Sequence, residues 1–154
     1  MYLITVLLLM AVLPICSIGW EHFFHDSSVP LTLLMGKWFV FWAAGVRLFS
    51  AGLRQFFQPR FTSEKIFGLR SDDALPIVRE LGVANFATGV VGIASLGKPN
   101  FVLPVAIIAA IFYGVAGIHH VAQSHRSRNE NIAMISDLFV FLILVTYLGF
   151  VAFA

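Results

Sequence analysis

Charge is scarce in this chain. Only 12% of its 154 residues are Asp, Glu, Lys or Arg, while 59% are hydrophobic, and the mean hydropathy is +0.89. A soluble domain of this length could not hide so much apolar surface, because too many of its positions face water. The composition therefore indicates an integral membrane protein surrounded by a lipid bilayer. The formal charge is only +2 and no long Lys/Arg run occurs, so nucleic acid is not an expected partner.

Motifs of catalysis are also absent from the sequence. Cys16 is the only cysteine, which excludes an intrachain disulfide. We find no nucleophile elbow, phosphate-binding loop or cysteine cluster. An enzyme is therefore the least favoured class of function, and the sequence identifies no cofactor.

What the sequence does contain is five long apolar runs. Each approaches the ~20 residues that cross the hydrocarbon layer as a helix. The runs are continuously apolar rather than alternating, so helices are the expected spanning form. We predict one all-α transmembrane bundle over residues 1–154, with a four-helix core and an N-terminal helix. The five spans are expected at about residues 2–19, 31–57, 75–96, 101–121 and 132–153.

The first run has an alternative interpretation. The small residues around Gly19 could form a cleavage site, which would make residues 1–19 a signal peptide. The positively charged start of a signal peptide is missing, however. We therefore expect the first helix to be retained.

Basic residues are distributed unevenly between the segments that connect the runs. One side holds Arg54, Arg60, Lys65, Arg70, Arg79, Arg126 and Arg128, whereas the other has only Lys37 and Lys98. Segments rich in Lys and Arg stay on the cytoplasmic side. This bias predicts a multi-pass protein of the inner (cytoplasmic) membrane, with its N-terminus in the cytoplasm and its C-terminus outside.

Polar residues inside the apolar runs gather in the cytoplasmic half. At a rise of 1.5 Å per residue, Arg47 lies about 15 Å from the inner end of the second run. An unpaired charge at such depth costs at least ~2.5 kcal/mol, so Arg47 should face the bundle interior, paired with Asp137 or Glu80. We predict a polar ligand-binding layer made of Arg47, Arg54, Gln55, Glu80, Asn85, His119, His120 and Asp137.

Helical spacing places part of this layer on faces that contact other helices. Ala44, Arg47, Ala51 and Arg54 fall at intervals of three, four and three residues, and so do Gly82, Asn85, Gly89 and Gly92. A third row consists of Ala106, Ala110 and Gly114. Rows of small residues let helices approach closely in lipid.

Each polar residue also has a simpler explanation. Arg54 could snorkel to the interface, Glu80 could mark a solvated helix start, and Asn85 could link two helices. Arg47 and Asp137 could form an ion pair that only sets helix register. At the outer boundary, His22, His25 and Asp26 are weak metal-site candidates. The His119-His120 pair is equally weak as a site for haem or a pigment.

The inner loop between residues 58 and 74 contains its own structural signals. Pro59 should end the second helix, and the sequence "TSEK" predicts a short helix starting after Thr62 or Ser63. Ser71 to Asp73 offer a cap ahead of the third span. The loop's apolar side chains suggest that it lies on the membrane surface or covers the polar layer as a lid.

Three segments carry a resemblance to known proteins. They are "GVRLFSAGLRQFFQPRFTSEKIFG", "IVRELGVANFATGVVGI" and "IHHVAQ…NENIAMISDLFV". The chain resembles a family of small bacterial integral membrane proteins of unknown function and, more remotely, the DoxX-like group of compact helical bundles. The resemblance covers roughly Lys37 to Phe153. It implies a helical bundle in a bacterial inner membrane and carries no activity.

Two functional hypotheses follow from these observations. In the first, the inner polar layer encloses a pocket that binds a lipid-like, quinone-like or anionic small molecule. In the second, the chain is an accessory subunit whose Gly/Ala faces dock onto another membrane protein or a second copy. The polar layer would then only hold helices in register.

Overall fold

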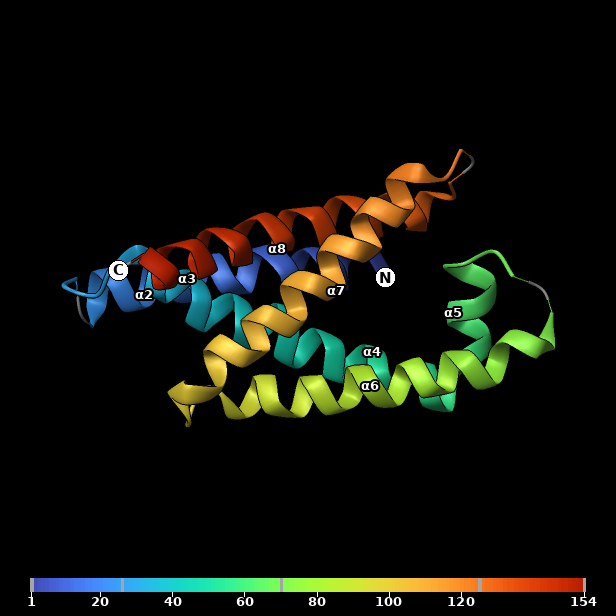
Figure 1. Ribbon diagram of the computed structural model, residues 1–154, viewed down its shortest axis with the longest axis horizontal. Helices are drawn as coiled ribbons and strands as arrows, with labels where there is room; N and C mark the ends of the chain where they lie inside the picture. Colours follow the sequence, from blue (N-terminus) through green and yellow to red (C-terminus); the bar gives the residue numbers. More distant parts are fainter. Residues whose placement is uncertain (1, 26, 70, 125, 154) are drawn as a thin grey trace.

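The computed structural model describes residues 2–25, 27–69, 71–124 and 126–153, and every element within them is helical. Five helices are long and apolar enough to cross a membrane, which confirms the predicted fold class. They run back and forth along one axis (Figure 1). Their bounds are Tyr2–Phe24, Leu31–Phe57, Asp72–Ala94, Pro99–Ala122 and Arg128–Phe153.

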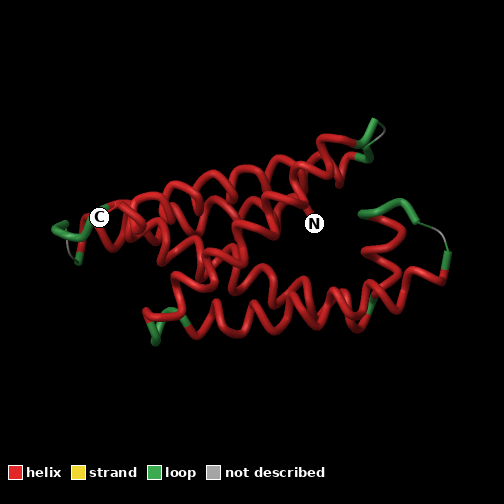
Figure 2. The backbone as a smooth tube through the Cα atoms, in the orientation of Figure 1, coloured by secondary structure: helices red, strands yellow, loops and turns green. Residues whose placement is uncertain are grey.

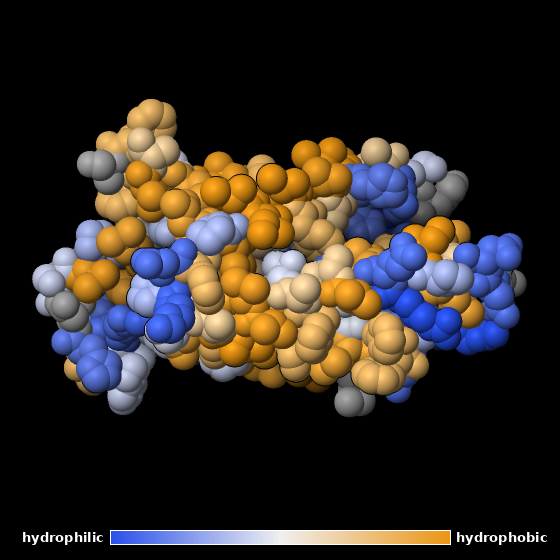
Figure 3. All heavy atoms as spheres, turned by 60° about the horizontal axis from the view of Figure 1, so that its bottom comes forward, coloured by the Kyte–Doolittle hydropathy of each residue, from blue (hydrophilic) through white to orange (hydrophobic). Residues whose placement is uncertain are grey.

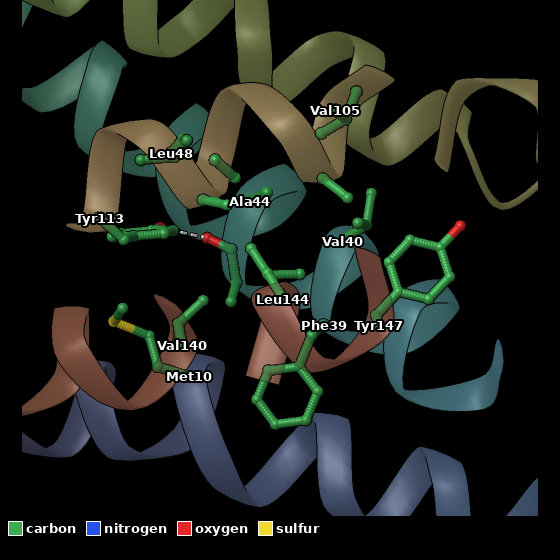
Figure 4. Packing of buried hydrophobic residues seen from close by; sticks show 14 of the residues in the cluster. Met10, Phe39, Val40, Ala44, Leu48, Val105, Tyr113, Val140, Leu144 and Tyr147 are labelled. Atoms are coloured by element: carbon green, nitrogen blue, oxygen red, sulfur yellow. Dashed lines mark hydrogen bonds between the residues drawn. The ribbon is translucent and has the colours of Figure 1, made fainter. Parts of the chain in front are cut away.

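The first two spans each contain a π-helical segment. The first consists of α1 (Tyr2–Leu7), η1 (Leu8–Val12) and α2 (Leu13–Phe24). The second consists of α3 (Leu31–Phe39), η2 (Val40–Val46) and α4 (Arg47–Phe57). Where η2 ends, the amide of Arg47 bonds to the Trp42 carbonyl rather than to that of Ala43. The Tyr113 hydroxyl of the fourth span donates to the Ala43 carbonyl instead, at 2.6 Å (Figure 4).

The other spans are α-helices, two of which begin with a 3-10 turn. The third is η3 (Asp72–Ala74) with α6 (Leu75–Ala94), the fourth is η4 (Pro99–Phe101) with α7 (Val102–Ala122), and the fifth is α8 (Arg128–Phe153). The Ser71 hydroxyl accepts from the Asp73 amide at 3.2 Å, so the cap expected ahead of the third span is present.

The first span continues five residues beyond the expected end at Gly19. Its last turns bind to the second span, because the Glu21 carboxylate accepts from Lys37 Nζ at 2.7 and 2.8 Å. The same carboxylate accepts from Trp38 Nε1 at 2.7 Å. These contacts of Glu21 stabilise helical structure in a segment whose composition alone suggested a loop.

The fifth span begins at Arg128, four residues before the expected Ile132. Ser127 and Glu130 form a capping box: the Glu130 carboxylate accepts from the Ser127 amide at 2.6 Å, and the Ser127 hydroxyl accepts from the Glu130 amide at 3.2 Å. Hydropathy does not register this polar first turn, which is why the predicted start was late.

The apolar core joins four spans. Buried side chains of η2, α7 and α8 meet around Ala44, Val105 and Leu144 (Figure 4). Val6 and Met10 bring the first span into the same cluster. In the described part of the chain, α6 contributes no residue to it. The N-terminal helix is thus part of the core rather than an addition to it, which differs from the predicted arrangement.

The third span is held instead by glycine contacts with η2 and α4 of the second span. A Cβ atom on Gly92 would lie 2.6 Å from Gly45 Cα, and one on Gly82 would lie 2.9 Å from the Phe56 amide nitrogen. Backbones therefore touch where side chains would normally separate them. Gly82, Asn85 and Gly89 are all buried, as the spacing predicted.

Hydrophilic side chains gather toward the two ends of the molecule, and mostly apolar side chains cover the belt between them (Figure 3). Many large apolar residues in this belt are exposed, which suits contact with lipid. The connecting loops lie at the two ends of the bundle (Figure 2). These features support a multi-pass membrane protein.

The helix pairs α4–α6 and α7–α8 diverge toward one end of the bundle (Figures 1 and 2). The short helix α5 (Pro59–Lys65) stands at that end, in the loop that leads to α6. The α7–α8 turn lies at the same end. This divergence determines where a cavity forms.

Candidate ligand-binding cavity

A cavity of about 260 Å³ lies between the diverging helix pairs. Its walls come from the first span, α4, α6, α7 and α8, and the segment from α5 to Phe67 adds a further wall. Val6, Leu48 and Tyr113 line the cavity and also belong to the apolar core, so the core closes it on one side. The volume exceeds what a single water molecule needs by a wide margin.

Polar residues of α4 point into the cavity at regular intervals. Arg47, Ala51 and Arg54 all line it, because positions seven apart in the regular helix that follows η2 return to the same face. This confirms the predicted face for these three residues. Ala44, on the other side of the helix transition, is fully buried in the core. The Arg54 guanidinium stacks over the Phe61 ring at 3.8 Å.

Gln55 and Asn85 link α4 to α6 beside the arginines. Asn85 Nδ2 donates to Gln55 Oε1 at 2.8 Å, and both side chains are buried. The glycines one turn away allow this short approach between the two helices. One amide pair satisfies only part of the hydrogen-bonding capacity of the two groups, so both residues can also bind a molecule in the cavity.

Asp137 and His120 form part of the opposite wall. Arg47 interacts electrostatically with Asp137 and with Tyr2, and all three line the cavity. Among the residues that the structure describes, no ion pair within 4.0 Å joins Arg47 to Asp137. The predicted direct pair is therefore replaced by two opposite charges that face a common space.

Two buried nitrogen atoms of this site have no hydrogen-bond partner among the residues that the structure describes. They are Arg47 Nε and His120 Nδ1, and the His120 side chain is only 6% exposed. Burying such groups without a partner costs roughly 1–3 kcal/mol each. Water or a ligand headgroup in the cavity would remove this cost, which makes the site suitable for a polar group.

Two of the predicted site residues lie elsewhere. Glu80 is exposed on α6 and is not part of the cavity lining, so it is not placed to balance Arg47. His119 is exposed on α7 and lines a second groove rather than the cavity. The cavity thus unites Arg47, Arg54, Gln55, Asn85, His120 and Asp137 from the predicted layer.

The weak metal-site candidates at the outer boundary are not brought together into a site. His22 lies next to Glu21, whose carboxylate is already bound by Lys37 and Trp38, and His25 is exposed. Asp26 lies outside the described residues. Within the described ranges no group of three or more His, Cys, Asp or Glu side chains is arranged to hold a metal.

The inner loop lies against the cavity. Phe61 and Thr62 of α5, and Ile66 and Phe67 after it, are among the lining residues. The helix begins at Pro59 rather than after Thr62 or Ser63, so the predicted start was wrong. Proline suits the first position of a helix because it needs no amide partner there, and this outweighed the capping pattern in "TSEK".

Sequence reasoning missed two tyrosines of the site. Tyr2 and Tyr113 line the cavity from the first span and from α7. Tyr113 is the single hydroxyl of its apolar run and Tyr2 is one of three in the first run, and these hydroxyls are the signal that could have found them. The predicted polar layer contains no residue of the first span.

The fold and the cavity together define a small multi-pass helical membrane protein with an internal polar site. The chain belongs to DUF6790, a family of unknown function whose model matches residues 1–154. The match includes the first span, which the sequence resemblance left out. No curated protein and no solved structure matches the chain.

Proposed function

We propose that this protein binds an amphipathic small molecule with an anionic headgroup in the cavity between α4, α7 and α8. One observation carries the proposal: two guanidinium groups, Arg47 and Arg54, line a space to which Asp137 contributes the only carboxylate among the described lining residues. The lining therefore has an excess of positive charge. The unpartnered nitrogen of Arg47 adds a donor suited to a carboxylate or phosphate oxygen.

The apolar part of the lining favours an amphipathic ligand over a free ion. Leu48, Phe61, Ile66, Leu81 and Phe112 surround the polar groups. Small-molecule sites typically combine such a surface with a few polar groups that orient the ligand. A neutral quinone would use the amides and His120 but would leave the excess charge unbalanced, so we rank an anionic amphiphile above it.

The membrane placement is part of the same proposal. Arg60, Lys65, Arg126 and Arg128 belong to the two loops at the end where the cavity lies. By the positive-inside rule this end faces the cytoplasm of a bacterial inner membrane, with the C-terminus outside. The remote relationship to DoxX-like bundles stays a prediction.

The accessory-subunit hypothesis is less well supported than ligand binding. It rested on Gly/Ala faces that could dock onto a partner. Gly45, Gly52, Gly89 and Gly92 contact the facing helix of the same chain, and Gly114 packs against Phe141 of α8. These faces are consumed within the bundle, so they offer no reason to invoke another subunit.

Native mass spectrometry of the protein in mild detergent tests the binding proposal. We expect added fatty acid or alkyl phosphate to form a one-to-one complex. Arg47→Gln should raise its dissociation constant about tenfold or more, as expected when a buried charge-assisted contact is lost. Lys98→Gln is the matched control, because it removes one positive charge at the other end of the bundle.

Three results would count against the proposal. The first is that no anionic amphiphile binds. The second is that the Arg47→Gln variant binds the ligand as well as the control variant Lys98→Gln and the unaltered protein do. The third is tight binding of a neutral quinone that is indifferent to Arg47, which would replace the anionic ligand by a quinone.

A further inference from the structure

A second hollow adjoins the cavity on the lipid-facing side of α7. Its volume is about 420 Å³, and it is lined by Phe67, Ile111, Phe112, Val115, Ala116, His119, His120 and Gln123. Four of these residues, Phe67, Phe112, Ala116 and His120, also line the polar cavity. The two spaces therefore meet between α7 and the segment that follows α5.

The outer groove has the character of a lipid-facing surface. Ile111 is 63% exposed and Val115 is 65% exposed, so its far side opens to the surroundings of the bundle. The lining residues extend along α7 from Ile111 to His120, which corresponds to about 14 Å of helix, and Gln123 lies just past its end. Apart from His119, His120 and Gln123 near the loop end, the lining is apolar.

The junction between the two spaces is formed by one row of side chains. Phe112, Ala116 and His120 are each four residues apart and lie on the same face of α7. Ala116 has the smallest side chain of the three, and it lies between the rings of Phe112 and His120 along the helix. Phe67 faces the same junction from the other wall. Ala116 is therefore the point in this row at which the least side-chain volume stands between the two spaces.

We propose that the anionic headgroup of the ligand lies in the polar cavity while its alkyl chain passes Ala116 and rests in the groove on α7. This inference rests on the proposed function and deepens it, because it specifies a headgroup joined to an alkyl chain that reaches the lipid sideways. The charges of Arg47 and Arg54 receive the headgroup, and the groove receives the chain. His120 Nδ1, unpartnered at the junction, faces the polar linkage between the two.

The test uses homologous alkyl carboxylates and alkyl phosphates of increasing chain length, with the full chain reconstituted in nanodiscs. Affinities are compared at equal mole fractions of ligand in the bilayer, because each added methylene also strengthens partitioning into lipid. On this scale the affinity should still rise with chain length. Val115→Trp, at a residue that lines the groove but not the polar cavity, should abolish this dependence and weaken the long-chain ligands at least tenfold, while short-chain ligands bind as before. Ile118→Trp, at an exposed α7 position outside the groove, is the control.

Photolabelling provides a second readout that does not depend on the tryptophan variant folding. A fatty acid with a diazirine at the end of its chain should label Ile111, Val115 or Phe67. Labelling confined to the α4–α6 pair would overturn the inference. So would Arg47-dependent binding whose affinity is the same for all chain lengths and unaffected by Val115→Trp.

The two levels of the proposal fail differently. If no ligand of either headgroup binds, or if binding ignores Arg47, the proposed function itself is wrong. If short and long ligands bind equally and Arg47 matters, only the groove assignment is wrong. A preference for carboxylates or for phosphates of equal chain length identifies which anion the site favours.

Discussion

Arg47 shows how a charged side chain is accommodated deep in an apolar helix. A guanidinium at the centre of a membrane span costs about 2.5–3.5 kcal/mol on insertion scales. In this protein the cost is not offset by a close ion pair, because no carboxylate lies within 4.0 Å among the described residues. Arg47 instead shares a cavity with Asp137 and Tyr2, both of which interact with it electrostatically. A charge placed in this way remains available to a ligand.

The shared cavity predicts partial coupling between Arg47 and Asp137. Replacing either charge alone, as in Arg47→Met or Asp137→Asn, leaves the other without its counter-charge and should destabilise the fold by about 1–3 kcal/mol. The double variant should cost about 0.5–1.5 kcal/mol less than the sum, since the interaction acts across a space. Reversible unfolding in mixed micelles measures both quantities. Strictly additive losses, with Lys98→Met neutral, would show that the two charges act independently.

At the scale of elements, the α4–α6 pair determines the position of the site. Glycines bring the two backbones into contact, which brings Gln55 and Asn85 within 2.8 Å of each other. The π-helical η2 precedes this contact and gives Tyr113 a free carbonyl to bind. The cavity therefore depends on features that lie outside its own lining.

Gly52→Ala tests the backbone contact directly. An added Cβ would meet the Phe86 amide nitrogen and the Gly82 carbonyl oxygen, which are backbone atoms that cannot rotate away. We expect a loss of about 1–3 kcal/mol in unfolding free energy from this overpacking. Gly149→Ala is the matched control, because nothing lies within 4 Å of its Cβ position, and it should be neutral or stabilise by up to about 1 kcal/mol. Equal effects of the two variants would remove the glycine contact as a determinant of the fold.

At the scale of the whole molecule, the same end of the bundle carries the divergence of the helix pairs, the short helix α5 and the basic loops. The opposite end has two lysines, of which Lys37 is neutralised by Glu21. The cavity thus lies toward the more basic end of an asymmetric molecule. Such an end attracts anionic headgroups near the membrane surface.

The topology that follows from this asymmetry can be tested with reporter fusions. A reporter fused at Ala154 and one inserted between Arg60 and Leu69 should report opposite sides of the membrane, with the loop insertion in the cytoplasm. The physical reason is the positive-inside rule together with five spans. Two reporters on the same side would contradict the five-span arrangement, whereas exchanged sides would contradict the proposed orientation only.

Much of this architecture was determined by the sequence itself, because hydropathy and helical period are local properties. Continuous apolar runs require helices in lipid, and intervals of three and four residues place Arg47, Ala51 and Arg54 on one face. The buried glycines of α6 follow from the same periodicity. Local patterns were least accurate at the helix ends: Glu21 extends the first span, and Ser127 with Glu130 starts the last one early.

Only the tertiary structure decided which polar residues meet. Asp137 was the preferred partner of Arg47 and Glu80 the next candidate, but their spacing alone did not separate them. Only Asp137 lines the cavity, because the rotation of each helix is set by its packing partners. Tyr2 joins the site from a span that seemed peripheral. The groove on α7 could not be predicted at all, since a hollow is the space that packing leaves between elements. Periodicity determines which face of a helix is buried, but the distance at which two buried faces diverge depends on every side chain between them.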